Sequence, residues 1–137
     1  MRSYLDQLRA AGDLDVVARE VDPRFELAAV TALYQEIRDG ALLFENVRGA
    51  SMPVVTNVFG SRRRICAMIG ANDLAFCPAW HRLTNRVSGR GETVAVEPPP
   101  RREAKIGDLP HLTYFERDAA PYITAGIFLA RDPDTGV

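Results

Sequence analysis

Two short stretches with strand patterns, on either side of one amphipathic stretch, constrain this fold more than any other feature. Residues 14–21 are rich in Val and roughly alternate between apolar and polar, and residues 41–47 form an apolar run too short for a helix, so both are predicted to be strands. Between them, Asp22-Pro23 is a typical helix start and Gly40 a typical helix end. The apolar face of this helix is expected to carry Leu27, Val30, Tyr34 and Ile37. The pattern predicts an α/β (α+β) fold, with a small mixed sheet flanked by helices.

Further elements are expected around this centre. A helix over 3–11, ended by Gly12, precedes the first strand, and another strand is predicted over 54–59. The stretch 61–70 is predicted to be a helix that turns Ile65, Met68 and Ile69 inward. A later helix is expected to carry Trp80, Leu83, Thr84 and Val87 on one face and to end near Gly89, with a short strand over 93–96.

Three consecutive prolines divide the chain. Because proline lacks an amide donor and disfavours helix, residues 97–107 are predicted to be a linker between a domain over 1–96 and a segment over 108–137. In that segment, 122–130 is predicted to be a strand, and 132–136 (DPDTG) a turn. A strand and turn with no return strand leave backbone groups unpaired. We therefore expect a partner at this edge, either a continuation of the chain or another chain.

Composition excludes several classes of protein. With 137 residues the chain suits one domain, or one and a fraction, and its 17 basic residues are balanced by 18 acidic ones, which argues against a general nucleic-acid binder. No apolar run approaches the roughly 18 residues of a membrane span. Charges come too early for a signal peptide, so we expect a cytoplasmic protein. Cys66 and Cys77 form no recognisable pair and are expected to be small buried side chains.

Motifs for catalysis are scarce. His81 and His111 are isolated and are expected on the surface or on a helix face, because neither has a partner at metal-ligand spacing. The sequence contains no GxGxxG, GxxxxGK[ST] or GxSxG motif. The arginines at 62–64 allow two interpretations. A solvated helix face is preferred, and a phosphate-binding cluster at a helix start is the alternative.

Three stretches carry a resemblance to a known family. They are LRAAGDLDVVAREVDPRFELAAV (8–30), ALLFENVRGASMPVVTNVFGSRRRICAMIG (41–70) and RDAAPYITAGIFLARDPDTG (117–136). In order and spacing they resemble the amino-terminal portion of UbiD-family decarboxylases, the 3-octaprenyl-4-hydroxybenzoate carboxy-lyase-like enzymes. The specific parts are FENV-x-G, FGSRRR, PYITAG and RDPxTG, whereas residues 72–107 match poorly.

The resemblance implies a reversible, non-oxidative decarboxylation of an aromatic, heteroaromatic or α,β-unsaturated acid. It also implies prenylated FMN, a divalent metal such as Mn²⁺ and a monovalent cation such as K⁺, held by a central split-barrel domain. Residues 1–96 would be the amino-terminal domain, and 108–137 would begin the central one. Thr124 in PYITAG looks like the threonine that lines the flavin pocket, with Gly126 beside it. The catalytic residues and metal ligands would lie beyond Val137, so the chain alone is expected to be inactive.

Partners follow from the same resemblance. The expected partner is the remainder of the decarboxylase, either in the same polypeptide or in a second subunit of a split enzyme, and the complete enzyme is expected to be a homo-oligomer. A non-catalytic interaction module that associates with itself is the alternative. A nucleic-acid binder acting through Arg62, Arg63 and Arg64 is the least favoured class.

Overall fold

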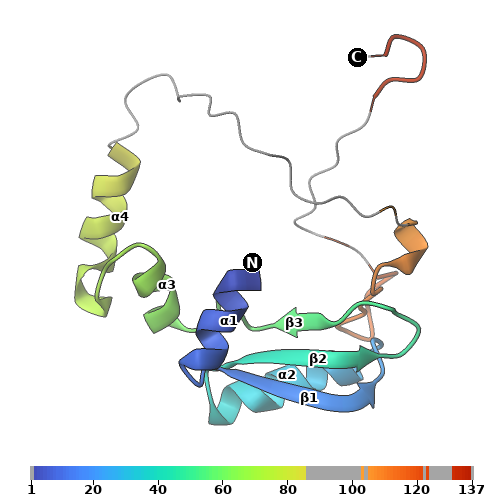
Figure 1. The fold of residues 1–137 in the computed structure, drawn as a ribbon, viewed down its shortest axis with the longest axis horizontal. Coiled ribbons are helices and arrows are strands. Elements are labelled where there is room, and N and C mark those ends of the chain that lie inside the picture. Colours follow the sequence, from blue (N-terminus) through green and yellow to red (C-terminus); the bar gives the residue numbers. More distant parts are fainter. Residues whose placement is uncertain (1, 86–102, 104, 122, 124–130, 137) are drawn as a thin grey trace.

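A three-stranded sheet forms the centre of the computed structural model, which describes residues 2–85, 103, 105–121, 123 and 131–136 (Figure 1). Its strands are β1 (Leu14–Val21), β2 (Ala41–Val47) and β3 (Val54–Thr56), in the order β1-β2-β3. The first pair is parallel and the second antiparallel, so the predicted mixed sheet is confirmed.

Helices cover both faces of this sheet. Alternate residues of β2 contact different helices: Leu42 and Phe44 share a cluster with Leu27 of α2 (Glu26–Ile37), whereas Ala41 shares one with Leu8 of α1 (Arg2–Ala10). Because neighbouring side chains of a strand point to opposite faces, the two helices lie on opposite sides of the sheet. Phe44, Leu27 and Val21 are the largest fully buried apolar side chains.

The start of α2 differs from the expectation. The helix begins at Glu26, because Phe25 takes a φ of 70° and the chain makes a turn after the strand. In this turn the Asp22 carboxylate accepts from the Arg24 amide (2.7 Å), and the Glu26 carboxylate accepts from the Asp22 amide (2.7 Å). The inward position of Ile37 was wrong, since its side chain is 84% exposed. Ile37 is the last residue of α2, and the cluster under the helix extends only as far as Tyr34.

The chain after β2 also departs from prediction. Strand β3 ends at Thr56 rather than at residue 59, because Asn57 has a φ of 55° and turns the chain. The next helix, α3 (Arg62–Met68), buries Arg64 and Cys66, whereas Met68 is 54% exposed and does not point inward. The Ser61 hydroxyl caps this helix by accepting from the Arg64 amide (3.5 Å).

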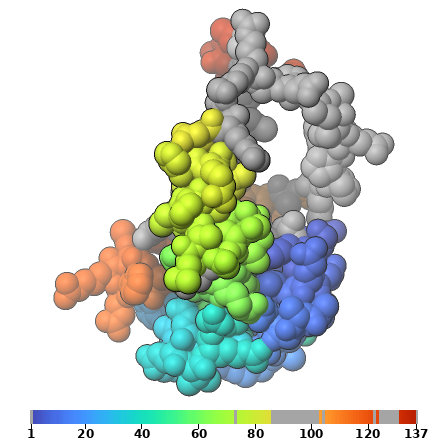
Figure 2. Space-filling model, turned by 90° about the vertical axis from the view of Figure 1, so that its left-hand side faces the viewer, coloured from blue at the N-terminus to red at the C-terminus, as the bar shows by residue number. Residues whose placement is uncertain are grey.

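Helix α4 (Phe76–Asn85) follows the short 3₁₀ turn η1 (Asp73–Ala75) and extends from the body of the molecule beyond α3 (Figures 1 and 2). Of its residues, Ala79 is buried, whereas Trp80 is 53% exposed. Cys77 is exposed, so its predicted burial was wrong, while Cys66 is buried as expected. Pro78 and Cys77 lie in the first turn of a helix that has little to pack against, which leaves the thiol on the surface.

A segment distant in sequence returns to the turn between β1 and α2. After the 3₁₀ turn η2 (Ile106–Asp108), Thr113 forms a parallel bridge with Arg24. The Phe25 amide donates to the Thr113 carbonyl (2.9 Å), and the Thr113 amide donates to the Pro23 carbonyl (3.2 Å). Leu112 packs against the buried cluster under α2. The start of the second predicted segment is thereby attached to the N-terminal unit.

The remaining sequence predictions concern residues 93–107 and 122–136. The turn at 132–136 is confirmed: the Gly136 amide donates to the Asp132 carbonyl (2.9 Å), and Asp132 Oδ1 accepts from the Thr135 amide (2.7 Å). The strands predicted over 122–130 and 93–96 and most of the linker 97–107 lie outside the described residues. In the described part of the chain, no helix is long and apolar enough to cross a membrane.

Candidate functional site

The one site residue assigned from sequence, Thr124, lies outside the described residues, as does Gly126. Within the described part, no group of three His, Cys, Asp or Glu side chains is arranged to hold a metal ion. Both histidines lie on the surface, and Nε2 of the His81 ring forms a hydrogen bond with the side-chain amide nitrogen of Asn85 (2.8 Å). The family motifs that the structure does describe form two polar clusters.

The first cluster centres on Arg64 of the FGSRRR motif. Its side chain is 3% exposed, and it donates through Nε to the Val58 carbonyl (3.2 Å) and through Nη2 to the Asn57 carbonyl (2.8 Å). Its Nη1 is buried with no hydrogen-bond partner in the described part of the chain. Burying a guanidinium is costly unless it is hydrogen-bonded, so these two bonds are needed to keep Arg64 buried. Through them, Arg64 holds the loop between β3 and α3 against the start of α3.

Asn57 extends this cluster to α2 and β2. Its side-chain Nδ2 donates to the Gly40 carbonyl (2.7 Å), and its Oδ1 accepts from the Gln35 side chain (2.6 Å). Asparagine tolerates the positive φ of this position better than most residues. A Cβ added at Gly60 would collide with the Asn57 side chain, so the motif needs glycine there. The cluster therefore joins the end of α2, the start of β2 and the start of α3.

Asp39 completes the first cluster. A hydrogen bond with the Ser61 hydroxyl lowers the pKa of this carboxyl group, and the positive charges of Arg64 and Arg63 lower it further. Asp39 is thus held ionised beside the buried arginine. A carboxylate with a lowered pKa is a poor proton donor near neutral pH, so its role here is electrostatic support.

The three consecutive arginines have three different environments. Arg62 lies over the Phe76 ring (5.3 Å), and Arg63 forms an ion pair with both oxygens of Asp13 (2.6 and 2.8 Å). Arg64 is buried, so the interpretation as a solvated face was wrong for this residue. The spacing of Ser61 and Arg64 was the available signal, since a side chain three residues after a helix cap reaches back toward the preceding loop.

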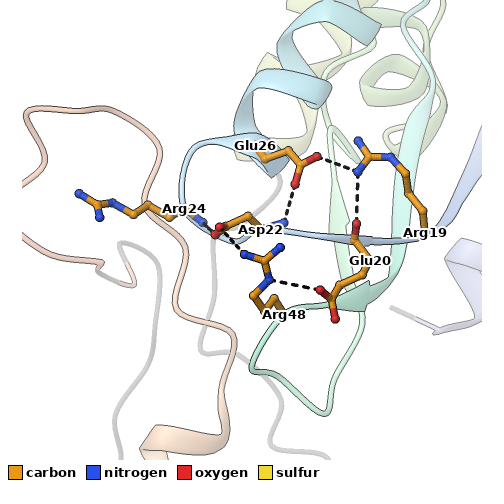
Figure 3. A network of polar contacts seen from close by, with 6 residues as sticks. All are labelled: Arg19, Glu20, Asp22, Arg24, Glu26 and Arg48. Atoms are coloured by element: carbon orange, nitrogen blue, oxygen red, sulfur yellow. Dashed lines mark hydrogen bonds and ion pairs between the residues drawn. The ribbon is translucent and has the colours of Figure 1, made fainter.

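The second cluster lies where β1 and β2 end and α2 begins (Figure 3). Arg48, which follows the FENV motif, bonds Asp22 (3.0 Å) and Glu20 (3.2 Å), while Arg19 bonds Glu26 (2.7 Å). The Asp22 amide, and then Arg19, lower the pKa of Glu26. Each carboxylate accepts from a partner within the cluster, so the arrangement ties three chain segments together and leaves no acid–base pair for a substrate.

Two cavities adjoin these elements. One of about 360 Å³ lies between α1 and α3 and includes Tyr4, Asp13 and Arg63 in its lining, and the other, of about 310 Å³, lies between α2 and residues 114–116. A flavin phosphate needs free cations or backbone donors. In the larger cavity, Arg63 is already paired with Asp13, whereas Arg64 also lines this cavity and its Nη1 has no hydrogen-bond partner in the described part of the chain. The charged side chain lining the smaller cavity is Glu116. Among the described residues, neither cavity has the group of carboxylate, histidine or cysteine ligands that would hold a divalent metal.

Comparison with protein families covers both regions of the chain. The 3-octaprenyl-4-hydroxybenzoate carboxy-lyase N-terminal domain matches residues 5–83, and the Rift-related domain of the same enzymes matches residues 87–137. The chain belongs to the UbiD family. The motifs that build both polar clusters, FENV-x-G and FGSRRR, lie within the region matched by the UbiD N-terminal domain.

Individual UbiD relatives are much longer. Anhydromevalonate phosphate decarboxylase from Methanothermobacter thermautotrophicus is 31% identical over the whole chain and 31% of its own length. The UbiD-class enzyme HmfF from Pelotomaculum thermopropionicum, solved in complex with FMN, is 34% identical with a TM-score of 0.74, covering 99% of this chain and 32% of its own. HmfF in an evolved dimeric form was solved in complex with prFMN, at 35% identity and a TM-score of 0.73, covering 99% of this chain and 33% of its own. This chain therefore spans about a third of the length of these UbiD relatives.

A phenol in this UbiD domain gives it a measurable response to alkaline pH. Burial and a hydrogen bond from the Tyr34 hydroxyl to Asp15 (2.6 Å) raise the pKa of Tyr34 to about 12 from 10.0. The folded chain holds this proton more tightly than the unfolded chain. The contribution of the protonated Tyr34 to the free energy of unfolding is therefore complete below pH 10 and is lost as the pH rises toward 12. We expect denaturant unfolding to show a steeper alkaline loss of stability in the native chain than in Tyr34→Phe. Parallel losses in the two proteins would contradict this assignment.

Proposed function

We propose that the chain is the amino-terminal scaffold portion of a UbiD-type, prenylated-FMN-dependent (de)carboxylase. The substrate would be an aromatic, heteroaromatic or α,β-unsaturated acid, and the catalytic residues would lie on the remainder of the enzyme. The observation that carries the proposal is the match of both family regions in succession, over residues 5–83 and 87–137. It is supported by the motif residues Arg48 and Arg64, whose contacts tie elements of the fold together.

The scaffold role has a physical basis in the contacts of Thr113. This residue belongs to the Rift-related region, whereas Pro23 and Phe25, to which its backbone is bonded, belong to the N-terminal domain. Leu112 anchors the same segment in the core under α2. In this way the first domain would set the position at which the flavin-binding domain begins. We propose boundaries of 1–96, 97–107 and 108–137 for domain, linker and start of the central domain.

Cofactors belong to the complete enzyme in this proposal. HmfF was solved with prFMN and with FMN, which supports a flavin for the enzyme that contains this chain. Thr124 is the one residue that we propose for the flavin pocket, and Mn²⁺ and K⁺ would be held by the remainder. The proposed location is the cytoplasm.

A chimera tests the scaffold role directly. In HmfF, the matched third would be replaced by this chain, and flavin retention and carbon dioxide release would be measured. We expect both to persist, because the two chains share a fold over 99% of this sequence. The isolated chain, supplied with prenylated FMN, Mn²⁺, K⁺ and a panel of unsaturated acids, is expected to release no carbon dioxide. A soluble chimera without flavin, or activity of the isolated chain, would contradict the proposal.

A small subunit of a split decarboxylase, or a non-catalytic interaction module, is the alternative. The split form is favoured by vanillic acid decarboxylase ShVdcCD from Sedimentibacter hydroxybenzoicus, which was solved with a second component, ShVdcD. This structure is 29% identical over 64% of this chain and 20% of its own, with a TM-score of 0.50.

The intact mass of the protein as its native host makes it separates the complete enzyme from a separate subunit or module. A mass several times 15.1 kDa supports the complete enzyme, whereas a product of 15.1 kDa supports a separate subunit or module.

A further inference from the structure

The larger cavity lies between two helices that do not fill the space between them. Helices α1 and α3 lie side by side, and the cavity of about 360 Å³ separates them (Figures 1 and 2). Its α1 side is formed by residues at positions i, i+3, i+4 and i+7, which share one face of a helix: Tyr4, Gln7, Leu8 and Ala11. Its α3 side is formed by Arg63, Arg64, Ala67 and Met68.

The cavity has a buried end and an open end. Arg64 is 3% exposed and Leu8 is 4% exposed, so these two residues mark the buried end. Ala67 is exposed and Met68 is 54% exposed, so the opening lies beside the second half of α3. A small molecule can therefore enter from solvent and reach the buried arginine. The volume is within the range of small-molecule sites.

One hydrogen-bond donor in this lining has no acceptor. Arg64 donates through Nε and Nη2 to two backbone carbonyls of the preceding loop, whereas its Nη1 is buried without a partner in the described part of the chain. A guanidinium has donors only, so Nη1 can be satisfied only by an acceptor atom. The two bonds to the loop hold the guanidinium in place, which prevents Nη1 from turning toward solvent. The site therefore needs an acceptor that is brought to it.

Charges around the cavity favour a carboxylate over a phosphate group. Arg63 is paired with both carboxylate oxygens of Asp13 (2.6 and 2.8 Å). A second carboxylate, Asp39, is held ionised, because its hydrogen bond with Ser61 and the charge of Arg64 lower its pKa. These two negative charges disfavour a doubly charged phosphate. A carboxylate carries one charge, and its hydrogen bonds to a guanidinium are stronger than those of a neutral carbonyl.

The rest of the lining fits an apolar body attached to this carboxylate. Leu8, Ala11 and Ala67 provide aliphatic surface, and Tyr4 provides an aromatic ring. A lone carboxylate ion would leave most of the cavity and this apolar surface unoccupied. Met68 lies at the opening, and its unbranched thioether side chain can adapt to an apolar group of variable shape.

We propose that the cavity between α1 and α3 binds a small monocarboxylic acid with an apolar body. Nη1 of Arg64 donates to the carboxylate at the buried end, and the apolar body lies between the ring of Tyr4 and the methyl group of Ala67. This inference is independent of the proposed decarboxylase role, because it rests on α1, α3 and the loop that Arg64 holds.

Titration of the ¹⁵N-labelled chain with sodium benzoate tests the site. We expect saturable chemical-shift changes in the amides of residues 4–11 and 63–68, with a dissociation constant of about 1 mM or lower. Benzamide lacks the charge, acetate lacks the apolar body, and benzylamine replaces the acceptor with a cation. Each of these, and inorganic phosphate, is expected to bind at least about tenfold more weakly than benzoate.

Two alanine substitutions test the location. Ala67→Leu fills the cavity without removing a contact of Arg64 and is expected to weaken benzoate binding at least about tenfold. Ala10→Leu is the matched control, because Ala10 is an exposed residue of α1 outside the lining, and its affinity is expected to match that of the unmodified chain. Arg64→Met is expected to abolish binding, and Ala67→Leu keeps the test valid if Arg64→Met fails to fold. Circular dichroism verifies the fold of each variant.

Several results would overturn the proposal. No saturable change up to about 10 mM benzoate would leave the cavity to a side chain from another part of a longer enzyme. Shift changes confined to other elements would place the ligand elsewhere. Equal affinities for benzamide and benzoate would contradict the carboxylate, and equal weakening by Ala10→Leu and Ala67→Leu would contradict the location.

Discussion

Arg64→Met is expected to lower the free energy of unfolding by about 3 kcal/mol. The substitution keeps a long side chain, but it removes the donors to the Asn57 and Val58 carbonyls, which lie in the loop that α3 closes. It also removes the positive charge beside Asp39, whose ionised form that charge favours. Urea denaturation followed by circular dichroism measures this change.

Arg63→Met is the matched control for this experiment. Arg63 is the adjacent residue in the same motif, but its side chain is 65% exposed in its ion pair with Asp13. Because the guanidinium of this pair is exposed whereas the Asp13 side chain is 15% exposed, the control is expected to lose about 1 kcal/mol, less than Arg64→Met. If the two substitutions destabilise the chain equally, the buried position of Arg64 has no special role in the fold.

Phe44→Ala is expected to lower the free energy of unfolding by about 4 kcal/mol, enough to unfold much of a marginally stable domain. Phe44 is 0% exposed and lies in the buried cluster with Val21 and Leu27. Its removal leaves a cavity between the sheet and α2 that the surrounding side chains fill only in part. Thermal unfolding and urea denaturation measure the loss.

The control for Phe44 is Leu74→Ala. Leu74 is 97% exposed, so its truncation removes little buried area and is expected to change stability by less than about 0.5 kcal/mol. A small effect of Phe44→Ala would mean that the cluster under α2 is not the main core of the domain. With Arg64, this experiment tests whether the FENV and FGSRRR motifs serve folding, as the structure indicates.

Local sequence patterns were sufficient to predict the central strands and the turn near the end of the chain. The strand bounds 14–21 and 41–47 were correct because alternation in the first stretch and a short apolar run in the second are local signals. The turn at 132–136 was correct because its side-chain and glycine chemistry is also local. The family was recognisable from motif order and spacing. Thr124, the one site residue assigned from sequence, falls outside the described residues and stays a prediction.

Other features depended on contacts between distant segments. The positive φ of Phe25 delays the start of α2, in a turn whose Phe25 amide is bonded to Thr113, 88 positions later. The burial of Arg64 depends on carbonyls that face it only after β3 has turned at Asn57. Exposure of Ile37 and Cys77 reflects which neighbours each helix meets, and that information is absent from the periodicity of either helix.

The sequence by itself therefore determined the family, the mixed α/β composition and the order of the central elements, because periodicity, turn residues and motif spacing act over short distances. The tertiary structure alone decided which of three consecutive arginines is buried and that a cavity is left between α1 and α3. Burial depends on the packing of segments far apart in the chain, and a local pattern does not contain it.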